Sequence, residues 1–289
     1  MIRTRGLMKR YGPIAALDGV DLEVPPGIVY GLIGPNGAGK TTLLSLLAGL
    51  RQPTAGDIVI DRGALAVLPD TPRFDPWLTA AEVVSLAARL AGPGAREDLN
   101  AVLAEAGLAE AARRRVGGFS RGMLQRLGLA ATVVGRPEIL LLDEPAAALD
   151  PGGRREVLDL IRRLRGRATV VFSSHILADV QEVSDWVGIL DQGRLRFQGP
   201  VDELLVARSR PTYRVRVHSG RDGVAAGLRQ TSWVENVEVL DDQTLRVRVN
   251  SSEDAERGLM GVLDRSGARV AAVEPEALDL EDFFLEATR

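Results

Sequence analysis

The segment from Gly34 to Thr41, which reads G-P-N-G-A-G-K-T, restricts the possible folds of this chain more than any other stretch. Two glycines enclose four residues and are followed directly by Lys40 and Thr41. The segment follows an apolar run, residues 28–33, and precedes a helix-like run, residues 42–50. This strand–loop–helix setting is the one that a phosphate-binding loop requires.

The glycines allow a tight turn, so that successive backbone N–H groups point inward and form an anion site at the start of a helix. Lys40 would reach the β- and γ-phosphates, and the Thr41 hydroxyl would ligate Mg²⁺. The alternative is a glycine-rich turn that matches the pattern by chance, and the flanking strand and helix argue against it. We therefore expect the chain to bind a nucleoside triphosphate.

The composition limits where such a protein works. The 289 residues, 45% of them hydrophobic, are enough for one large or two ordinary domains, and the net charge of -3 gives no basic surface for nucleic acid. The absence of cysteine excludes disulfides and thiolate metal sites. The first residues lack the apolar core of a signal peptide, and no apolar stretch approaches the roughly 18 residues of a membrane helix. We expect a soluble cytosolic protein that reaches a membrane only through a partner.

A second motif follows the apolar run at residues 139–142, which ends in Asp143 and Glu144. The run is typical of a buried parallel strand, and the two carboxylates stand at its C-terminal end, where open α/β sheets bind ligands. Asp143 would hold Mg²⁺, usually through water, and Glu144 would polarise the attacking water. Two solvated loop residues are the alternative, which the phosphate loop upstream disfavours.

Three further residues are candidates with ordinary alternatives. Ser120 opens an apolar helix that runs to residue 134, and it could simply cap that helix. His175 ends an apolar strand, residues 169–173, where it could contact the γ-phosphate, although a single histidine is usually a surface or core group. Tyr11, in a loop predicted at residues 9–12, could stack on a purine or serve only in packing, and the sequence leaves both open.

The remaining patterns predict the rest of an α/β fold. Residues 57–60 and 65–68 are expected to form a hairpin, followed by helices at about 79–91 and 97–106. From residue 213 onward, strictly alternating strands and two helical stretches predict a small α+β sandwich of ferredoxin-like type. We therefore divide the chain into an ATP-binding domain, 1–208, with a helical subdomain at about 71–135, and an accessory domain, 209–289.

Six segments along the first two thirds of the chain resemble the motifs of the nucleotide-binding subunit of ABC transporters, and they follow one another in the order that this family has. The phosphate loop with Thr42 matches the Walker A motif, and residues 139–144 match the Walker B motif with its catalytic glutamate. Residues 120–123 stand where the family has its S-G-G-Q signature. Residues 148–150 match the D-loop, His175 matches the switch histidine, and Tyr11 matches the adenine-stacking aromatic residue.

The resemblance implies a P-loop NTPase fold of mixed sheet and helices, with ATP and Mg²⁺ as cofactors. It implies that ATP contacts Tyr11, Gly34, Pro35, Asn36, Gly37, Ala38, Gly39, Lys40, Thr41, Thr42, Ser120, Gly122 and Asp150. It assigns catalysis to Glu144, His175 and Lys40, and Mg²⁺ coordination to Thr41, Asp143 and Asp70.

The resemblance also implies partners. Two ATP-binding subunits, identical or different, would close head to tail around two ATP molecules. A separately encoded membrane permease would hold them at the cytoplasmic face of the cell membrane. Phe74 and Trp77 fall where the family receives its permease, and as core residues they would be equally ordinary. The accessory domain could brace the dimer, regulate it or merely support packing.

The chain departs from the family pattern at several positions. Asp70 stands where the family usually has a glutamine, and the stretch from Lys40 to Asp70 is short. Arg121 and Met123 replace the Gly and Gln of the signature, as is frequent in the drug-exporter-like branch. Residues 280–285, L-E-D-F-F-L, resemble the tail of bacterial exporter ATPases.

Other functions remain as alternatives to an exporter ATPase. Ribosome-associated members of the family usually carry two cassettes, and DNA-repair members insert a long coiled coil. This chain has one Walker A motif and no sustained heptads. An importer ATPase is a nearer alternative, which Asp70 and the altered signature disfavour.

Overall fold

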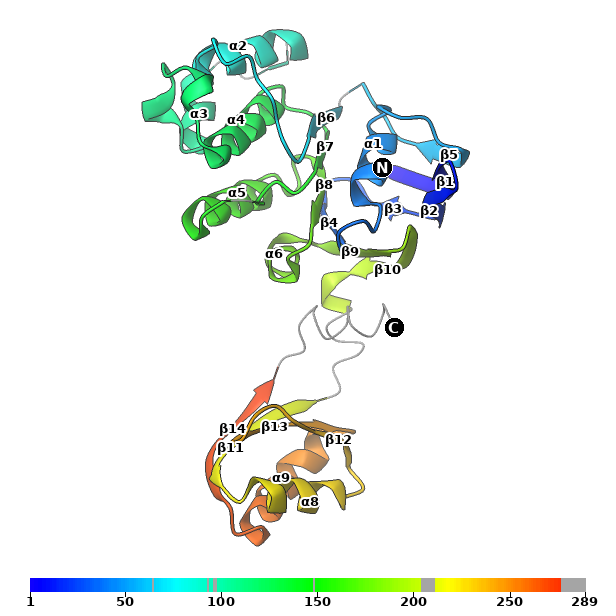
Figure 1. Ribbon diagram of the computed structural model, residues 1–289, viewed down its shortest axis with the longest axis vertical. Helices are drawn as coiled ribbons and strands as arrows, with labels where there is room; N and C mark the ends of the chain where they lie inside the picture. The colour runs from blue at the N-terminus through cyan, green and yellow to red at the C-terminus, as the bar shows by residue number, and fades with distance from the viewer. Residues whose placement is uncertain (64, 93, 96–97, 148, 204–210, 277–289) are drawn as a thin grey trace. The chain divides into compact units, whose positions relative to one another are not determined.

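The computed structural model describes residues 1–63, 65–92, 94–95, 98–147, 149–203 and 211–276 (Figure 1). The chain divides into two compact units, Met1–Asp202 and a second that begins at Glu203. The expected domain boundary between residues 208 and 209, the D-loop residue Ala148 and the exporter-like tail at 280–285 lie outside the described residues.

A six-stranded sheet forms the centre of the first unit, within the described ranges, in the order β10-β9-β4-β8-β7-β6. Neighbouring strands of this sheet pair in parallel, except that β10 is antiparallel to β9. Strands β4, β7 and β8 are buried along their whole length, because helices cover both faces of the sheet. The strands are β4 Val29–Ile33, β6 Leu65–Leu68, β7 Ile139–Leu142, β8 Thr169–Ser174, β9 Trp186–Asp191 and β10 Arg194–Pro200.

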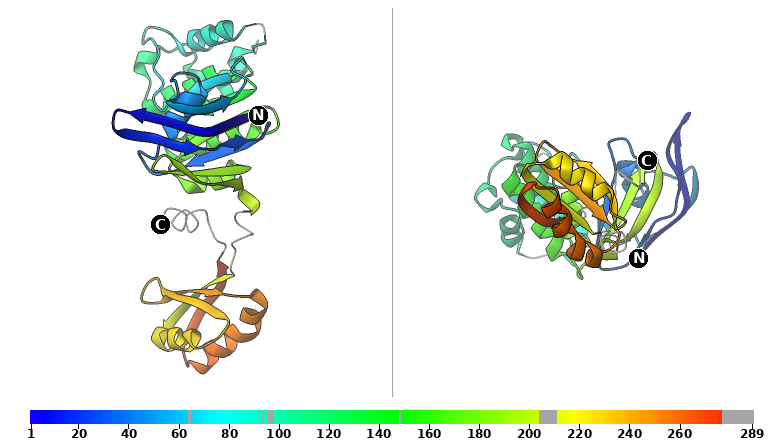
Figure 2. Two further views of the ribbon diagram at one scale, coloured as in Figure 1. Left: turned by 90° about the vertical axis from the view of Figure 1, so that its right-hand side faces the viewer. Right: turned by 90° about the horizontal axis from the view of Figure 1, so that it is seen from below.

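An antiparallel sheet covers one side of this core (Figure 2). Its central strand β1 (Ile2–Tyr11) pairs with β2 (Ile14–Val20), β3 (Glu23–Val24) and β5 (Ala55–Val59). Helix α1 (Lys40–Leu47) packs its leucines into the apolar cluster shared by the two sheets. The phosphate loop lies between β4 and α1, and the packing of these two elements in the same apolar cluster holds both of its ends.

The predicted hairpin at residues 57–60 and 65–68 is wrong. Strand β5 pairs with β1, with Thr4 opposite Ile58, whereas β6 pairs in parallel with β7, with Leu68 opposite Leu142. The physical reason is that Ile58 of β5 and Leu65 of β6 pack against the same apolar cluster, so the apolar pattern alone does not decide which strand each of them pairs with. The two expected arms therefore belong to different sheets.

Three helices pack together at one end of the first unit: α2 (Ala80–Ala91), α3 (Leu99–Glu105) and α4 (Arg121–Val133) (Figure 1). Helix α2 begins as predicted, because the Thr79 N–H donates to Glu82 Oε2 at 2.7 Å and Thr79 Oγ1 accepts from Glu82 N at 3.3 Å. Two short 3₁₀ helices, Ala109–Ala111 and Val116–Gly118, lead into α4. Helices α5 (Pro151–Arg163) and α6 (Leu177–Val183) cover the sheet face opposite α1 (Figure 1).

The second unit is a βαββαβ sandwich of ferredoxin-like type, as the alternating strands predict. Its antiparallel strands have the order β12-β13-β11-β14, and both helices lie on the same face of the sheet (Figure 2). The apolar cluster between helices and sheet includes Val215, Leu245, Val224 and Leu259. The elements are β11 Thr212–Ser219, α8 Arg221–Arg229, β12 Val234–Val239, β13 Thr244–Val249, α9 Ser252–Arg265 and β14 Arg269–Glu276.

Throughout the described ranges, no helix is long and apolar enough to cross a bilayer.

One buried polar group in the central sheet has no partner. Tyr30 of β4 is fully buried, and no described residue hydrogen-bonds its phenol oxygen Oη. Burial raises the pKa of this phenol. A Cβ added to Gly188 of the neighbouring strand β9 would lie 2.1 Å from Tyr30 Oη. The ring therefore requires a glycine at position 188.

Replacing Tyr30 by phenylalanine should leave the free energy of unfolding unchanged or raise it by up to about 1 kcal/mol, because the buried hydroxyl has no hydrogen bond to lose. Gly188→Ala should cost about 1–3 kcal/mol through overlap with Oη, and the Tyr30→Phe background should recover part of that loss. Urea unfolding of the single and double variants measures this coupling. Easier unfolding of Tyr30→Phe would contradict the assignment of an unpartnered hydroxyl.

Candidate active site

The candidate residues meet at one edge of the central sheet because their strands run in parallel. Ile33, the last residue of β4, lies opposite Ser174, and Leu142 at the end of β7 lies opposite Phe172. The phosphate loop, the Asp143–Glu144 pair and His175 follow these strand ends directly. Ligands of open α/β sheets bind at this edge.

The glycines of the phosphate loop are required by close backbone contacts. A Cβ at Gly34 would lie 2.2 Å from the carbonyl oxygen of Leu190. Gly39, which caps α1, has a φ of 108°, and a Cβ there would lie 2.5 Å from the carbonyl oxygen of Ala16. The loop can therefore keep this path to the N-terminus of α1 only with glycine at both positions.

Lys40 is buried inside the loop that it ends. Its ammonium Nζ donates to the carbonyl oxygen of Gly34 at 2.7 Å, and it lies 3.5 Å from Glu144 Oε1. The side chain is only 7% exposed. A buried ammonium that faces main-chain oxygens and a carboxylate is well placed to exchange them for phosphate oxygens.

The Glu144 carboxylate lies between two basic groups. Lys40 faces Oε1, and Nδ1 of His175 lies 2.9 Å from Oε2. The backbone of Glu144 has a φ of 48°, which is unusual for a residue with a side chain. Its N–H donates to Ser173 Oγ at 2.8 Å, and its carbonyl accepts a 3.4 Å hydrogen bond from Gln125 Nε2. Such strained residues are frequent at functional sites.

Asp143 has the properties of a metal ligand. Its side chain is buried, and Oδ1 accepts a hydrogen bond from Ser173 Oγ at 2.6 Å, while no described residue bonds its second oxygen, Oδ2. The Thr41 hydroxyl, in the first turn of α1, likewise makes no bond within the described chain. Two hard oxygen donors fit Mg²⁺. No cluster of three His, Cys, Asp or Glu side chains exists among the described residues, so phosphate and water oxygens would have to complete the shell.

Ser120, Gly122 and Asp150 lie at helix N-termini. Ser120 Oγ accepts from Met123 N at 3.3 Å at the start of α4, and Asp150 Oδ1 accepts from Gly153 N at 2.8 Å at the start of α5. A Cβ at Gly122 would lie 3.0 Å from the Leu149 side chain, so the two helix starts touch. Both polar groups serve as caps within the chain, and no described contact joins either one to the phosphate loop.

Tyr11 is 39% exposed and lies at the end of β1 rather than in a loop, so the loop predicted at residues 9–12 begins later. The ammonium of Lys9 lies 5.2 Å from the ring centroid, and the guanidinium carbon of Arg51 lies 5.5 Å from it. The partial exposure is compatible with both stacking on a purine and packing, so both interpretations of Tyr11 stay open.

Asp70 is the sequence candidate with the weakest link to the other site residues. It follows β6, the neighbour of β7, and its carboxylate is exposed. Within the described chain, the side chain makes one bond: Oδ2 accepts from the Thr71 hydroxyl at 3.3 Å. The strand order brings Asp70 to the same sheet edge as Asp143 without a direct contact.

Known proteins share both the sequence and the fold. A family model described as "ABC transporter" matches residues 17–147. The chain is 37% identical to the ABC transporter ATP-binding protein YxlF of Bacillus subtilis (strain 168), over 99% of each chain. It is 35% identical to the daunorubicin resistance ATP-binding protein DrrA3 of Streptomyces coeruleorubidus, over 99% of this chain and 95% of that protein.

This chain belongs to the ABC transporter family. A solved dimeric ATP-binding cassette in a post-hydrolysis state with ADP and phosphate superposes on 70% of this chain and 99% of its own, with a TM-score of 0.64 and 25% identity. The chain is thus the ATP-binding and ATP-hydrolysing subunit of an ABC transporter, in the exporter-like branch of its antibiotic-resistance relatives. The expectations of a P-loop NTPase fold and of ATPase activity are confirmed.

The sequence reasoning missed two residues that hold Asp143 and Glu144 in place. Ser173 bonds both Asp143 and the backbone of Glu144, and Gln125 of the signature helix α4 reaches the Glu144 carbonyl. Ser173 is a hydroxyl residue near the end of an apolar strand, two residues before His175, and this signal could have found it. Gln125 carries no such signal, because its role depends on how α4 packs.

A third missed element links the D-loop helix to the switch helix. Arg154 in the first turn of α5 forms an ion pair with Asp179 in the first turn of α6, with Nη2 and Oδ1 2.5 Å apart. Burial raises the pKa of Asp179, and the hydrogen bond and charge of Arg154 counteract that shift. The pair fixes the two helices whose starts carry Asp150 and His175.

Ser173→Ala should lower the free energy of unfolding by about 1–3 kcal/mol, because it leaves Asp143 Oδ1 and the Glu144 N–H without their partner. ATP turnover should fall more than ATP affinity, since the phosphate loop is untouched. Denaturant unfolding and steady-state ATPase assays measure both. Thr132→Ala is the matched control, because Thr132 bonds only a carbonyl of its own helix and should keep full turnover per folded molecule. Normal turnover in Ser173→Ala would contradict its positioning role.

Proposed function

We propose that this chain powers export of an antibiotic-like compound through a separately encoded membrane permease, with two ATP-binding subunits closing around two ATP molecules. The observation that carries the proposal is the Glu144 carboxylate held between Lys40 and His175 beside the phosphate loop. This is the arrangement that cleavage of a terminal phosphate by water needs. The daunorubicin resistance of one relative, and bacitracin transport by a Bacillus licheniformis relative 32% identical to the chain, support the class of cargo.

The main-chain N–H groups of residues 34–42 would hold the phosphates, with the ammonium of Lys40 between the β- and γ-phosphates. Thr41 and Asp143 would ligate Mg²⁺, and Asp70 would contribute through water. Bound Mg²⁺ would neutralise charge on the phosphate oxygens. The Tyr11 ring would stack on adenine.

The ion pair between Lys40 and Glu144 suggests how binding prepares hydrolysis. The Lys40 ammonium lies 3.5 Å from Glu144 Oε1. A γ-phosphate is a stronger partner for Lys40 and would draw it away, so that Oε1 becomes free to accept a proton from water. His175 would keep Oε2 fixed and would contact the γ-phosphate itself.

The signature and D-loop residues support a head-to-tail dimer. Ser120 and Gly122 mark the N-terminus of a 13-residue helix, a site suited to a phosphate, yet no described contact joins them to the phosphate loop of the same chain. A second subunit, identical or different, would supply them. Because this half of the site comes from the partner, closure of the dimer would need ATP, and hydrolysis would loosen it.

The helical segment carries a surface suited to the permease. Trp77 is 73% exposed, and Leu86 and Leu90 of α2 are 44% and 80% exposed. Three large apolar side chains along 14 residues favour a protein contact over a core role for Trp77, whereas Phe74 is half-buried and fits either role. The permease would hold the subunit at the cytoplasmic face of the membrane. The domain from residue 209 would brace or regulate the dimer.

Glu144→Gln should lower ATP turnover at least about 100-fold, because the amide cannot take the proton, while ATP binding persists. With ATP, this variant should dimerise and should copurify a polytopic membrane protein from gently solubilised native membranes. Light scattering and mass spectrometry of the purified complex measure these outcomes. Recovery with ribosomes, or alone from the soluble fraction, would contradict the transport proposal, and normal turnover would exclude Glu144 as the base.

Asp70→Asn tests the unusual acid in place of glutamine. If Asp70 holds Mg²⁺ through water, loss of its charge should raise the Mg²⁺ concentration needed for half-maximal turnover several-fold. The matched control is Asp57→Asn. Asp57 is an exposed acid of β5, a strand that belongs to the antiparallel sheet and not to the central sheet. Identical Mg²⁺ titrations for Asp70→Asn and wild type would reduce Asp70 to a loop residue.

A further inference from the structure

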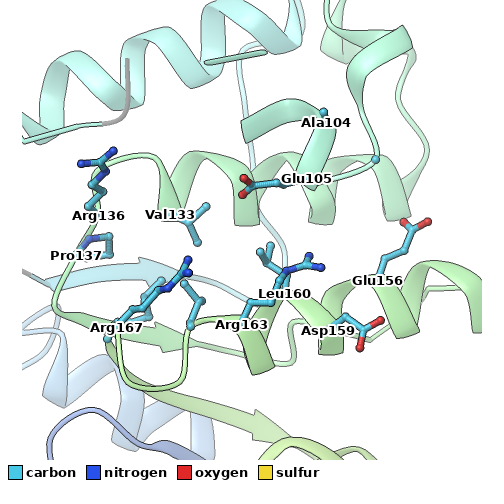
Figure 3. Close-up of a pocket in the computed structure, with 14 residues that line it drawn as sticks. Ala104, Glu105, Val133, Arg136, Pro137, Glu156, Asp159, Leu160, Arg163 and Arg167 are labelled. Atoms are coloured by element: carbon cyan, nitrogen blue, oxygen red, sulfur yellow. The ribbon is translucent and has the colours of Figure 1, made fainter. Parts of the chain in front are cut away.

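A cavity of about 860 Å³ lies in the first unit away from the candidate active site (Figure 3). The ends of α3, α4 and α5 surround it, and Val133, Leu140, Leu160 and Ala168 give it an apolar floor. Pro137 and Ala168, which line it, precede strands β7 and β8, whereas the candidate active site follows the same strands. The two sites therefore lie at opposite edges of the sheet.

Three arginines give this cavity a positive wall. Arg136 follows α4, Arg163 ends α5, and Arg167 lies in the turn before β8 (Figure 3). None of the three guanidinium groups forms a hydrogen bond or an ion pair within the described chain. Clustered arginines without acidic partners repel one another and keep the full capacity to bind an anion.

The acids of the same cavity do not neutralise these arginines. Glu156 pairs with Arg126 at 3.2 Å, and Asp159 pairs with Arg162 at 3.1 Å. Glu105 also has an interaction of its own. In Figure 3, Glu156 and Asp159 lie at one end of the cavity, Arg136 and Arg167 lie at the other, and Arg163 lies between the two groups. The unpaired positive charge therefore extends from one end to the middle of the cavity.

The backbone at Arg136 adds a separate observation. Its φ of 49° lies in the left-handed region, as does that of the catalytic Glu144, and Pro137 follows it. This conformation is strained for a residue with a side chain. A glycine would avoid that strain, yet the position carries a long cation that lines the cavity.

We propose that this cavity binds an amphiphilic small-molecule anion, whose phosphate, sulfonate or carboxylate head contacts Arg136, Arg163 and Arg167 and whose apolar body covers the floor. The volume suits a drug-sized molecule. The apolar floor selects for an organic body, and the three guanidinium groups select for a charged head.

The same helices connect this cavity to the nucleotide site. Helix α4 starts at the signature residue Ser120 and ends at Val133, and α5 is capped by Asp150 and ends at Arg163. A ligand held between their C-terminal ends changes the preferred placement of their N-terminal ends, which touch at Gly122 and Leu149. Occupancy of the cavity therefore alters affinity for ATP, and this step rests on the proposed function of Ser120 and Asp150.

The direct test uses 8-anilinonaphthalene-1-sulfonate, an anion with an apolar body, titrated by fluorescence and calorimetry into the full chain. Arg163→Gln/Arg167→Gln should bind it at least about tenfold more weakly than wild type. The matched control is Arg113→Gln/Arg155→Gln, which removes two exposed arginines outside the cavity. Unchanged affinity in the first variant, or equal loss in the control, overturns the proposal.

A neutral probe with a similar body, N-phenyl-1-naphthylamine, separates charge recognition from apolar contact. It should bind wild type and Arg163→Gln/Arg167→Gln with equal affinity, and selective loss in the variant would assign the effect to apolar packing and overturn the anion site. Flotation with phosphatidylglycerol vesicles tests a lipid headgroup as the source of the anion. Flotation that requires the two arginines would overturn the assignment to a soluble ligand.

Arg136→Gly separates binding from folding. The glycine relieves the left-handed strain, so the melting temperature should stay equal or rise by a few degrees, while affinity for the sulfonate falls several-fold. Loss of affinity with a lower melting temperature would assign Arg136 a structural role.

The link to ATP is measured with a non-hydrolysable ATP analogue in the presence and absence of saturating sulfonate. Its dissociation constant should change in wild type and stay constant in Arg163→Gln/Arg167→Gln. A constant value in wild type overturns the coupling. A protein that fails to bind the analogue contradicts the proposed function, while the sulfonate titration still decides the cavity.

Discussion

The contact between Lys40 and Glu144 is the interaction at the centre of the candidate active site, and the packing of the central sheet is the constraint on which it depends. It joins Lys40, the first residue of α1, to Glu144, which follows β7 and lies 104 residues further along the chain. It forms only because β4, β8 and β7 are parallel neighbours whose C-terminal ends meet at one edge. Glycines at positions 34 and 39 then bring the loop backbone close enough for a buried ammonium to face a carboxylate. Packing of the sheet thus produces the electrostatics of the site.

Residues whose roles follow from local pattern were predictable from sequence, and residues whose roles follow from packing were not. The phosphate loop, Asp143, Glu144 and His175 stand beside apolar strands that mark their positions, and the structure brings them together. The Thr79 helix cap likewise follows from a local pattern, the threonine with Glu82 three residues later. The ferredoxin-like order follows from the alternation of apolar and polar residues in the strands of the second unit. The hairpin failed because a turn signal does not state which sheet each arm will join.

The partners of Glu144 illustrate this limit. Ser173 contacts it because β8 lies beside β7 in one particular register, and Gln125 contacts it because α4 packs against the same edge. Neither fact is encoded near Glu144 in the chain. The strained φ of Glu144 is also visible only in three dimensions, and it explains why the neighbouring groups bond its N–H and its carbonyl. A functional carboxylate at a strained position needs its backbone held from both sides.

Contacts between helices also hold the residues of this edge relative to one another. The partly buried ion pair of Arg154 with Asp179 ties the start of α5 to the start of α6, and so it links the segments that carry Asp150 and His175. Breaking such a pair is unfavourable because one charge would stay buried without its partner. Helices α4 and α5 also touch at Gly122 and are bridged near their middle by Arg126 and Glu156. The starts of α4, α5 and α6, with the residues Ser120, Asp150 and His175 beside them, are therefore joined by one continuous set of contacts.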